Sequence, residues 1–147
     1  MVEFTRDALR GLDVEWFGVD RVGALAIFTT GYGVIPRKVF ESDERHRRLS
    51  EFFDGAPEIS EAHLVAGLDP RGTYELFLAE ARRGLYSYYH SDYGTREPYK
   101  LIAYPLAPLL VKDLPEEIQA MLAPFRFERI EFSQADTIRI DEHFECE

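Results

Sequence analysis

The alternation of side chains between residues 14 and 30 predicts a β-hairpin. Successive residues of a strand point to opposite faces, so Val14–Asp20 would carry Trp16 toward the core. The segment Asp20-Arg-Val-Gly23 has the composition of a tight turn, with aspartate first and glycine last. The β-prone run Ala24–Thr30 then returns antiparallel to the first strand, and we expect Phe28 in the core as well.

A glycine-marked loop, Gly31-Tyr-Gly-Val-Ile-Pro36, follows this hairpin. Its two glycines permit a sharp turn because they adopt backbone angles that other residues avoid. The loop does not fit the dinucleotide-binding pattern G-x-G-x-x-G, since Pro36 stands where the third glycine belongs, and no Walker lysine follows. We therefore interpret it as a turn that exposes Tyr32.

Helical periodicity is clearest between Thr73 and Gly84. Apolar residues recur there at i, i+3, i+4 and i+7 from Tyr74, with Thr73 as the N-cap and Gly84 as the residue that ends the helix. Three further helices are predicted: residues 5–11, residues 37–53, and a short helix from the capping box Asp113-Leu-Pro-Glu116 to Pro124.

The remaining apolar runs predict strands. They are Leu85–Ser91, Tyr99–Tyr104, Phe125–Phe132 and Thr137–Ile140, and the first two would form a second hairpin around the loop 93–98. Residues 58–72 stay open between a strand and one helical turn, because the apolar run is too short to decide.

This order of elements predicts the fold class. Two hairpins and a terminal strand pair favour a mainly antiparallel sheet of about five or six strands, with three to four helices packed mostly on one face. A chain of 147 residues without a low-complexity linker is typical of one domain. We therefore expect a single α+β domain over residues 1–147.

Charge narrows the classes of partner. The formal net charge is −10, and it grows along the chain. Residues 1–50 hold eight basic and eight acidic residues, residues 51–100 hold five and nine, and residues 101–147 hold four and ten. This balance argues against nucleic-acid binding, which needs clustered Lys and Arg, and it permits a basic protein partner. An acidic surface that serves solubility alone is the other interpretation.

Neither a membrane span nor a secretory signal is expected. The apolar runs are far shorter than a bilayer requires, and no basic segment followed by an apolar run opens the chain. The single cysteine, Cys146, allows no disulfide within the chain. We therefore expect a cytoplasmic protein.

No reaction centre can be selected from the residue pattern. The tail Asp141–Glu147 contains every type of metal ligand but only one His and one Cys, so we expect an acidic tail and neither a metal site nor a cofactor. Cys146 lies among carboxylates, which raise the pKa of a thiol and make it a poor nucleophile. A catalytic pair of carboxylates stays open, because no particular pair stands out.

Tyrosines supply the strongest candidate for a binding surface. Along the predicted strand Leu85–Ser91, Tyr86, Tyr88 and His90 share one face. Tyrosine is enriched at binding interfaces, although cross-strand aromatic pairing on a sheet would explain the same pattern. The candidate contact residues are four tyrosines, Tyr32, Tyr86, Tyr88 and Tyr93, and two steering charges, Asp20 and Asp92.

Several stretches together resemble a known kind of protein. They are Trp16-Phe-Gly-Val-Asp20, Ala26–Pro36, Gly84-Leu-Tyr-Ser-Tyr88, Tyr99–Pro105 and Leu114-Pro115. They are similar to an uncharacterised bacterial family of small acidic α+β proteins that resembles the immunity proteins of polymorphic toxin systems. Such proteins bind and neutralise a toxin made by the same cell. The resemblance implies no catalytic residues.

Three hypotheses follow for the function. The favoured one is a non-enzymatic binding protein of the bacterial cytoplasm, an immunity-type inhibitor that occludes a basic toxin site with an acidic, tyrosine-rich surface. The alternative is a small hydrolase or ligand-binding domain with a carboxylate-lined cleft. A third is a homo-oligomer that pairs through an exposed edge strand.

Overall fold

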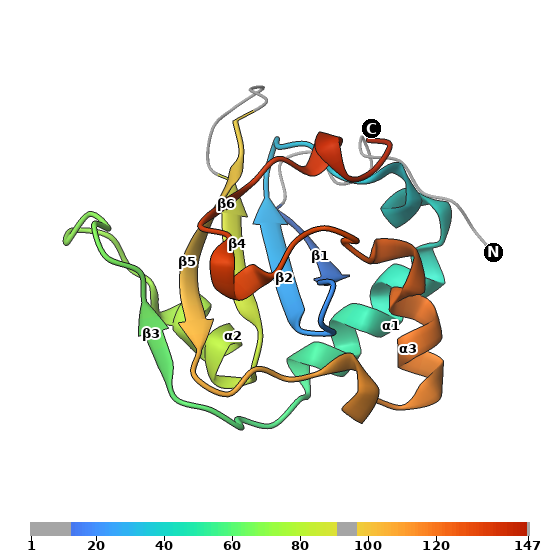
Figure 1. The fold of residues 1–147 in the computed structure, drawn as a ribbon, viewed down its shortest axis with the longest axis horizontal. Coiled ribbons are helices and arrows are strands. Elements are labelled where there is room, and N and C mark those ends of the chain that lie inside the picture. The colour runs from blue at the N-terminus through green and yellow to red at the C-terminus, as the bar shows by residue number, and fades with distance from the viewer. Residues whose placement is uncertain (1–12, 91–96, 147) are drawn as a thin grey trace.

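Figure 1 shows a computed structural model of the protein, which describes residues 13–90 and 97–146. In this part of the chain, six strands form one mixed sheet and three α-helices lie along it, which confirms the predicted α+β fold class. The strands are β1 (Val14–Val19), β2 (Leu25–Thr30), β3 (Ala62–Leu64), β4 (Tyr86–His90), β5 (Tyr99–Pro105) and β6 (Thr137–Ile138). The helices are α1 (Asp43–Asp54), α2 (Glu75–Arg82) and α3 (Glu116–Leu122).

The two predicted hairpins form the centre of the sheet. The order of strands is β1-β2-β4-β5-β3, and β6 pairs with β5. Within the hairpins β1 runs antiparallel to β2, with Trp16 opposite Phe28, and β4 runs antiparallel to β5. The hairpins join through β2 and β4, which are parallel and place Phe28 beside Tyr88. The prediction of a mainly antiparallel sheet is confirmed, with one parallel pair at its middle.

Alternation along the strands divides the core into two layers. On the face that we call the helix face, Phe17 of β1 and Ile27 of β2 pack against Leu49 and Phe53 of α1 and against α3. On the opposite face, Trp16 lies parallel to Phe28, with ring centroids 4.3 Å apart. Trp16 and Phe28 are therefore core residues, as predicted.

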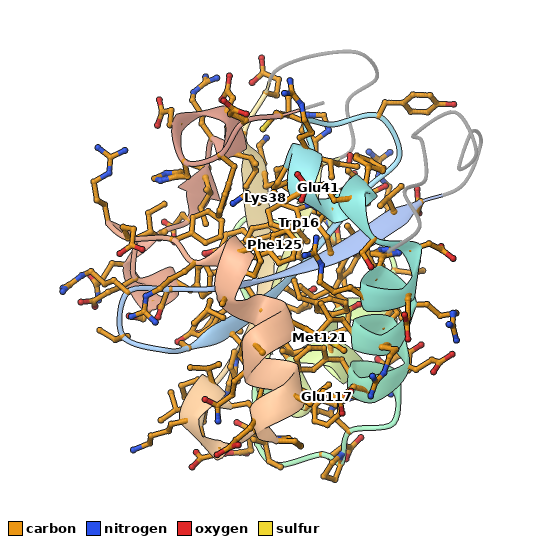
Figure 2. All side chains as sticks on the ribbon, turned by 90° about the vertical axis from the view of Figure 1, so that its right-hand side faces the viewer. Trp16, Lys38, Glu41, Glu117, Met121 and Phe125 are labelled. Atoms are coloured by element: carbon orange, nitrogen blue, oxygen red, sulfur yellow. The ribbon has the colours of Figure 1, made fainter. Side chains whose placement is uncertain are left out.

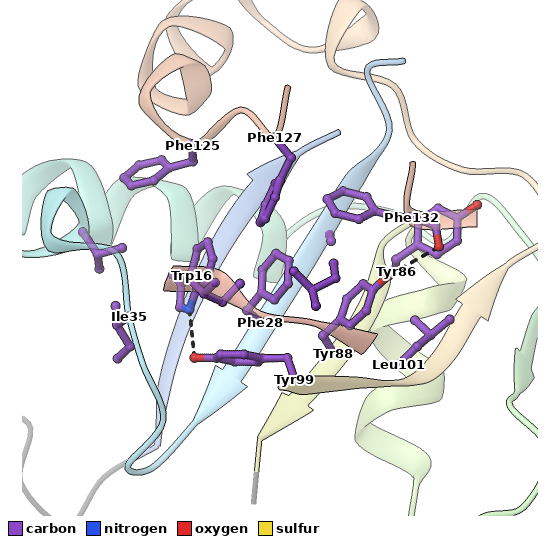
Figure 3. Close-up of a cluster of buried hydrophobic side chains, with 14 of the residues drawn as sticks. Trp16, Phe28, Ile35, Tyr86, Tyr88, Tyr99, Leu101, Phe125, Phe127 and Phe132 are labelled. Atoms are coloured by element: carbon purple, nitrogen blue, oxygen red, sulfur yellow. Dashed lines mark hydrogen bonds between the residues drawn. The ribbon is translucent and has the colours of Figure 1, made fainter. Parts of the chain in front are cut away.

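Aromatic rings fill the second layer, as Figure 3 shows. The Trp16 indole N–H donates to the Tyr99 hydroxyl over 3.4 Å, and that hydroxyl donates to the Val34 carbonyl over 2.7 Å. Beyond the C-terminal end of α3, Phe125 lies near Trp16 (Figure 2). The Arg45 guanidinium of α1 lies 5.0 Å from the centroid of the Phe125 ring. The polar ends of Trp16 and Tyr99 thus keep partners although their rings are buried.

The segment 125–146, which we call the C-terminal cover, lies over this aromatic layer. The predicted strand Phe125–Phe132 is wrong, since its only ladder contact is an isolated bridge between Val19 and Arg126. The apolar run predicted a strand, but Phe125 and Phe127 pack onto the face of the sheet and do not extend its ladder. The predicted strand Thr137–Ile140 shrinks to β6.

Buried Asp20 attaches the cover to the β1–β2 turn. One carboxylate oxygen accepts the N–H groups of Val22 and Ala24 at 3.0 and 2.9 Å, and the other accepts the Phe132 N–H at 2.9 Å. The prediction that Asp20 is a surface steering charge is therefore wrong, because its side chain is 1 % exposed and its acceptor capacity serves three main-chain groups.

The sequence pattern located the helices correctly, but several of their first and last residues differ from the prediction. The predicted helix 37–53 is interrupted at Ser42, whose hydroxyl accepts the Arg45 N–H over 3.1 Å and begins α1. The α2 helix begins after Tyr74 and not at Thr73, whereas Gly84 ends it in the predicted left-handed conformation, with φ of 91°. The N-cap of α3 is Pro115, which makes no side-chain cap hydrogen bond, and not the predicted Asp113. The predicted helix 5–11 lies outside the described residues.

We predict that Asp20→Asn destabilises the fold by about 2–3 kcal/mol, because it weakens a charge-assisted acceptor of three buried donors. Denaturant unfolding measures the change. Asp136→Asn is the matched control, since Asp136 is exposed on the cover and makes the same chemical change. Equal stability of the two variants would show that the Asp20 contacts contribute little.

Candidate functional site

Two of the predicted contact tyrosines are core residues. Tyr88 has 0 % exposure, stacks on Phe28 at 5.1 Å and donates its hydroxyl proton to the Ala135 carbonyl over 2.6 Å. Tyr86 is buried beside Phe132 in the same layer. Burial raises the pKa of both phenols. The prediction that Tyr86 and Tyr88 anchor a partner is therefore wrong, because the C-terminal cover occupies their face of the sheet.

Tyr32 is the predicted contact residue that the structure leaves at the surface, with 44 % exposure. The loop that carries Tyr32 is anchored to the end of β2, since the Gly33 N–H donates to the Thr30 hydroxyl over 2.7 Å. A Cβ at position 33 would lie 2.7 Å from the His90 ring, so glycine is required for this close approach. The remaining candidates, Tyr93 and Asp92, lie outside the described residues.

On the helix face, Glu15 lies within electrostatic reach of three other carboxylates, Asp13, Asp54 and Glu80. We call Asp13, Glu15, Asp54 and Glu80 the carboxylate cluster. Asp13 directly precedes β1, Glu15 is the second residue of that strand, Asp54 is the last residue of α1, and Glu80 comes from α2. Glu15 points to this face because it alternates with Trp16, whose ring lies on the other side.

Glu80 is the most buried member of the cluster, with 3 % exposure. Its carboxylate accepts a hydrogen bond from the Ser87 hydroxyl on β4 over 2.6 Å. Burial raises the pKa of Glu80 to about 7, with further increases from Glu15 and Asp54, whereas Ser87 and Arg83 oppose the shift. Near neutral pH this side chain therefore exchanges between its neutral and ionised forms.

Mutual repulsion extends through the cluster. Burial raises the pKa of Glu15, and the negative charges of Asp54 and Asp13 raise it further, while Arg83 lowers it. Arg83 forms no salt bridge with any cluster carboxylate among the described residues. The Arg83 guanidinium thus acts on Glu15 and Glu80 without a close ion pair, so the cluster carries excess negative charge.

Two aromatic side chains border the cluster. Tyr89 continues the row of Glu15 and Thr29 across the sheet, is half-buried, and packs against Phe77 of α2 with ring centroids 5.4 Å apart. Burial and the charge of Asp13 raise the pKa of Tyr89. On the other side, the Asp13 carboxylate lies 3.3 Å from the position of a Cβ on Gly31, next to Tyr32.

A second candidate lies between α1 and α3, where a surface hollow of about 420 Å³ is lined by residues that include Arg45, Arg48 and Met121. Figure 2 shows Met121 and Glu117 on the α3 side of this region. Arg48 forms a salt bridge with Glu117, and the Arg45 guanidinium donates to the Lys38 carbonyl. Its charges are therefore compensated within the protein, unlike those of the carboxylate cluster.

Neither a metal site nor a membrane segment emerges from the described part of the chain. No group of three or more His, Cys, Asp or Glu side chains among these residues is arranged to hold a metal ion. The helices within residues 13–90 and 97–146 lack the length and apolar character needed to cross a bilayer. The chemistry that remains is that of carboxylates, which bind cations and transfer protons.

The sequence contained one usable signal for the cluster. Glu15 shares a strand face with Phe17 and Val19, and a carboxylate on a face that is otherwise apolar indicates a special environment. Glu80 gave no such signal, since it lay off the apolar stripe of its helix and looked solvated. Only the packing of α2 against β4 buries it.

We predict that Glu80 makes the protein less stable as pH rises. Its folded pKa of about 7 lies above the ordinary value of 4.5, so its favourable contribution is complete below pH 4.5 and is lost toward pH 7. Glu80→Gln should therefore gain stability relative to wild type across this range, by about 2–3 kcal/mol at most. Denaturant unfolding at several pH values measures the difference. The control is Glu58→Gln, because Glu58 is exposed. If stability changed with pH in the same way in Glu80→Gln and Glu58→Gln, the pH dependence could not be assigned to Glu80.

Comparison of the chain with protein-family models, with curated proteins and with solved structures finds no match. The resemblance to immunity proteins therefore stays a prediction. The function has to be inferred from the geometry and charge of the carboxylate cluster and of the loop beside it.

Proposed function

We propose that the protein is a non-enzymatic binding protein that holds a cationic surface of a basic protein at the carboxylate cluster and Tyr32. The observation that supports this proposal is the electrostatic environment of Glu15, whose pKa is raised by burial and by the negative charges of Asp54 and Asp13 and is lowered by Arg83. Such repulsion destabilises the free protein. A lysine or arginine from a partner would relieve it, so the partner's binding energy would include the removal of this repulsion.

The proposed mechanism is occlusion. Exposed Asp13 and Asp54 attract the basic partner, and Tyr32 at the adjoining loop contributes a large apolar contact with a polar tip. The net charge of −10 favours association with basic proteins and disfavours nucleic acid. The finer proposal is an immunity-type inhibitor of the bacterial cytoplasm, which covers the basic active site of a toxin made by the same cell.

A second candidate function is a small hydrolase. It is favoured by the pKa of Glu80, which at about 7 suits a general acid, beside Glu15 as a second carboxylate. The two functions differ in what Glu80 does. A hydrolase would lose its activity in Glu80→Gln, whereas a binding protein would keep its affinity, because its partner is attracted by the exposed carboxylates of Asp13 and Asp54.

We predict that the double variant Asp13→Asn/Asp54→Asn loses affinity for the basic partner by about tenfold or more, through the loss of two attractive charges. Affinity capture from the native host identifies the partner, and calorimetry at low and high salt measures its binding. Wild-type affinity should fall as salt rises, since screening weakens charge attraction. Tyr32→Ala should also weaken binding without a change in this salt dependence.

The matched control is Glu128→Gln/Asp136→Asn, which removes the same two charges from the exposed surface of the C-terminal cover. It should bind as wild type does. Equal losses in both double variants would mean that net charge, and not the carboxylate cluster, determines binding. Unchanged binding in the cluster variant would overturn the proposed function.

To separate the two functions, we predict that Glu80→Gln binds the partner with an affinity within about twofold of wild type. We also predict that the wild-type protein has no hydrolytic activity. Turnover of ester, phosphoester and glycoside model substrates by the wild-type protein is the measurement. Activity in the wild type that is lost in Glu80→Gln but kept in Glu58→Gln would favour the hydrolase instead.

A further inference from the structure

Strand β3 lies at the margin of the sheet, with α2 behind it (Figure 1). It pairs with β5 through the main-chain groups of its odd-numbered positions. The Glu61 carbonyl accepts the Leu106 N–H, and the Val65 N–H donates to the Ile102 carbonyl, each over 3.0 Å. Main-chain groups alternate in direction along a strand, so those of Ala62 and Leu64 point away from β5.

Within residues 13–90 and 97–146, the outward main-chain groups of Ala62 and Leu64 have no hydrogen-bond partner. The opposite margin of the sheet differs. At β1, the Val19 carbonyl accepts the Phe127 N–H over 2.8 Å, and His46 Nε2 lies 2.6 Å from the Glu15 carbonyl oxygen. One margin is thus closed by the chain itself, while β3 presents donors and acceptors that a further strand could pair with.

Apolar side chains gather around the same margin. Six large apolar side chains are exposed in the described residues, and four of them come from segments beside β3: Ile59, Leu64, Leu76 and Leu106. Leu64 belongs to β3 and Leu76 to the adjoining helix α2. Leu106 follows β5, and its N–H donates to the Glu61 carbonyl. An unpaired strand bordered by exposed aliphatic side chains is typical of a protein interface.

We propose that β3 pairs antiparallel with β3 of a second copy of this chain, around a two-fold axis at His63. The outward groups at positions 62 and 64 are placed symmetrically about His63. A two-fold rotation therefore sets Ala62 opposite Leu64 of the second copy and satisfies all outward N–H and C=O groups of these residues. This proposal is independent of the carboxylate cluster.

The side-chain pattern of β3 fits a second copy as the occupant. In this register Glu61 lies opposite Val65 of the second copy, so the like charges of the two Glu61 residues are not opposed. Leu64 and Ala62 of the two copies share one face of the extended sheet, on the side of α2. The sheets of both copies then continue into one another, and β3 of each copy becomes an internal strand.

Sedimentation velocity of the full chain over a wide range of concentrations tests the pairing. Wild type should show a reversible monomer–dimer equilibrium. Ala62→Pro removes an outward donor without touching the ladder to β5, and Leu64→Lys places a charge on the apolar margin, so each should raise the dimer Kd at least about tenfold. Val22→Lys is the matched control, because Val22 is also exposed but lies at the β1–β2 turn.

A cysteine cross-link tests the register. Residues at a pair without main-chain hydrogen bonds approach most closely, so His63→Cys in a Cys146→Ser background should form an intermolecular disulfide, whereas Glu58→Cys in that background should not. Circular dichroism and thermal unfolding verify that each variant is folded.

Three results would overturn the proposal. The first is a wild-type protein that stays monomeric at all concentrations. The second is a dimer whose Kd in both Ala62→Pro and Leu64→Lys equals that of wild type, and the third is a dimer that cross-links equally well from position 58. A monomer that binds an extended peptide at β3 would assign the margin to another protein and would also overturn pairing between copies.

Discussion

The buried carboxylate of Asp20 is the constraint on which the arrangement of this protein depends. It accepts main-chain N–H groups from its own turn and from Phe132, more than a hundred residues later in the chain. A buried carboxylate is tolerated only where its oxygens are satisfied, so the turn and the C-terminal cover need each other. The Arg21 N–H reinforces the connection by donating to the Ile130 carbonyl over 2.9 Å.

This attachment determines which face of the sheet is available. Once Phe127 and Phe132 lie over the aromatic layer, Tyr86 and Tyr88 of β4 become core residues, and the Tyr88 hydroxyl bonds to the cover. The helix face is closed by α1 and α3 over Phe17, and by α2 over Ser87. The end of the helix face between α1 and α2 is where polar groups gather, because Asp54 ends one helix and Glu80 lies on the other.

The sequence was most informative where structure is local. The hairpin, the turn ending at Gly23 and the helix stop at Gly84 depend on residues that are neighbours in the chain, and each was predicted. Tyr88 was misjudged because its strand pattern is the same whether the face is wet or covered, and the cover comes from residues 44 and 47 positions away. Of the candidate site, Tyr32 could be predicted from its loop. The meeting of Glu15 with Glu80 could not, since it depends on how α2 packs.

The same packing that hides Glu80 gives the cluster its chemical character. Ala81, the next residue, is fully buried and holds α2 against the sheet, so the Glu80 carboxylate cannot move into water to escape Glu15. The protein can relieve this repulsion by binding a proton or by accepting a cation from outside. These two routes fall to different residues, because Glu80 is buried whereas Asp13 and Asp54 are exposed. Glu80 is relieved by taking up a proton, since burial raises its pKa to about 7, and a partner's cation meets the exposed carboxylates.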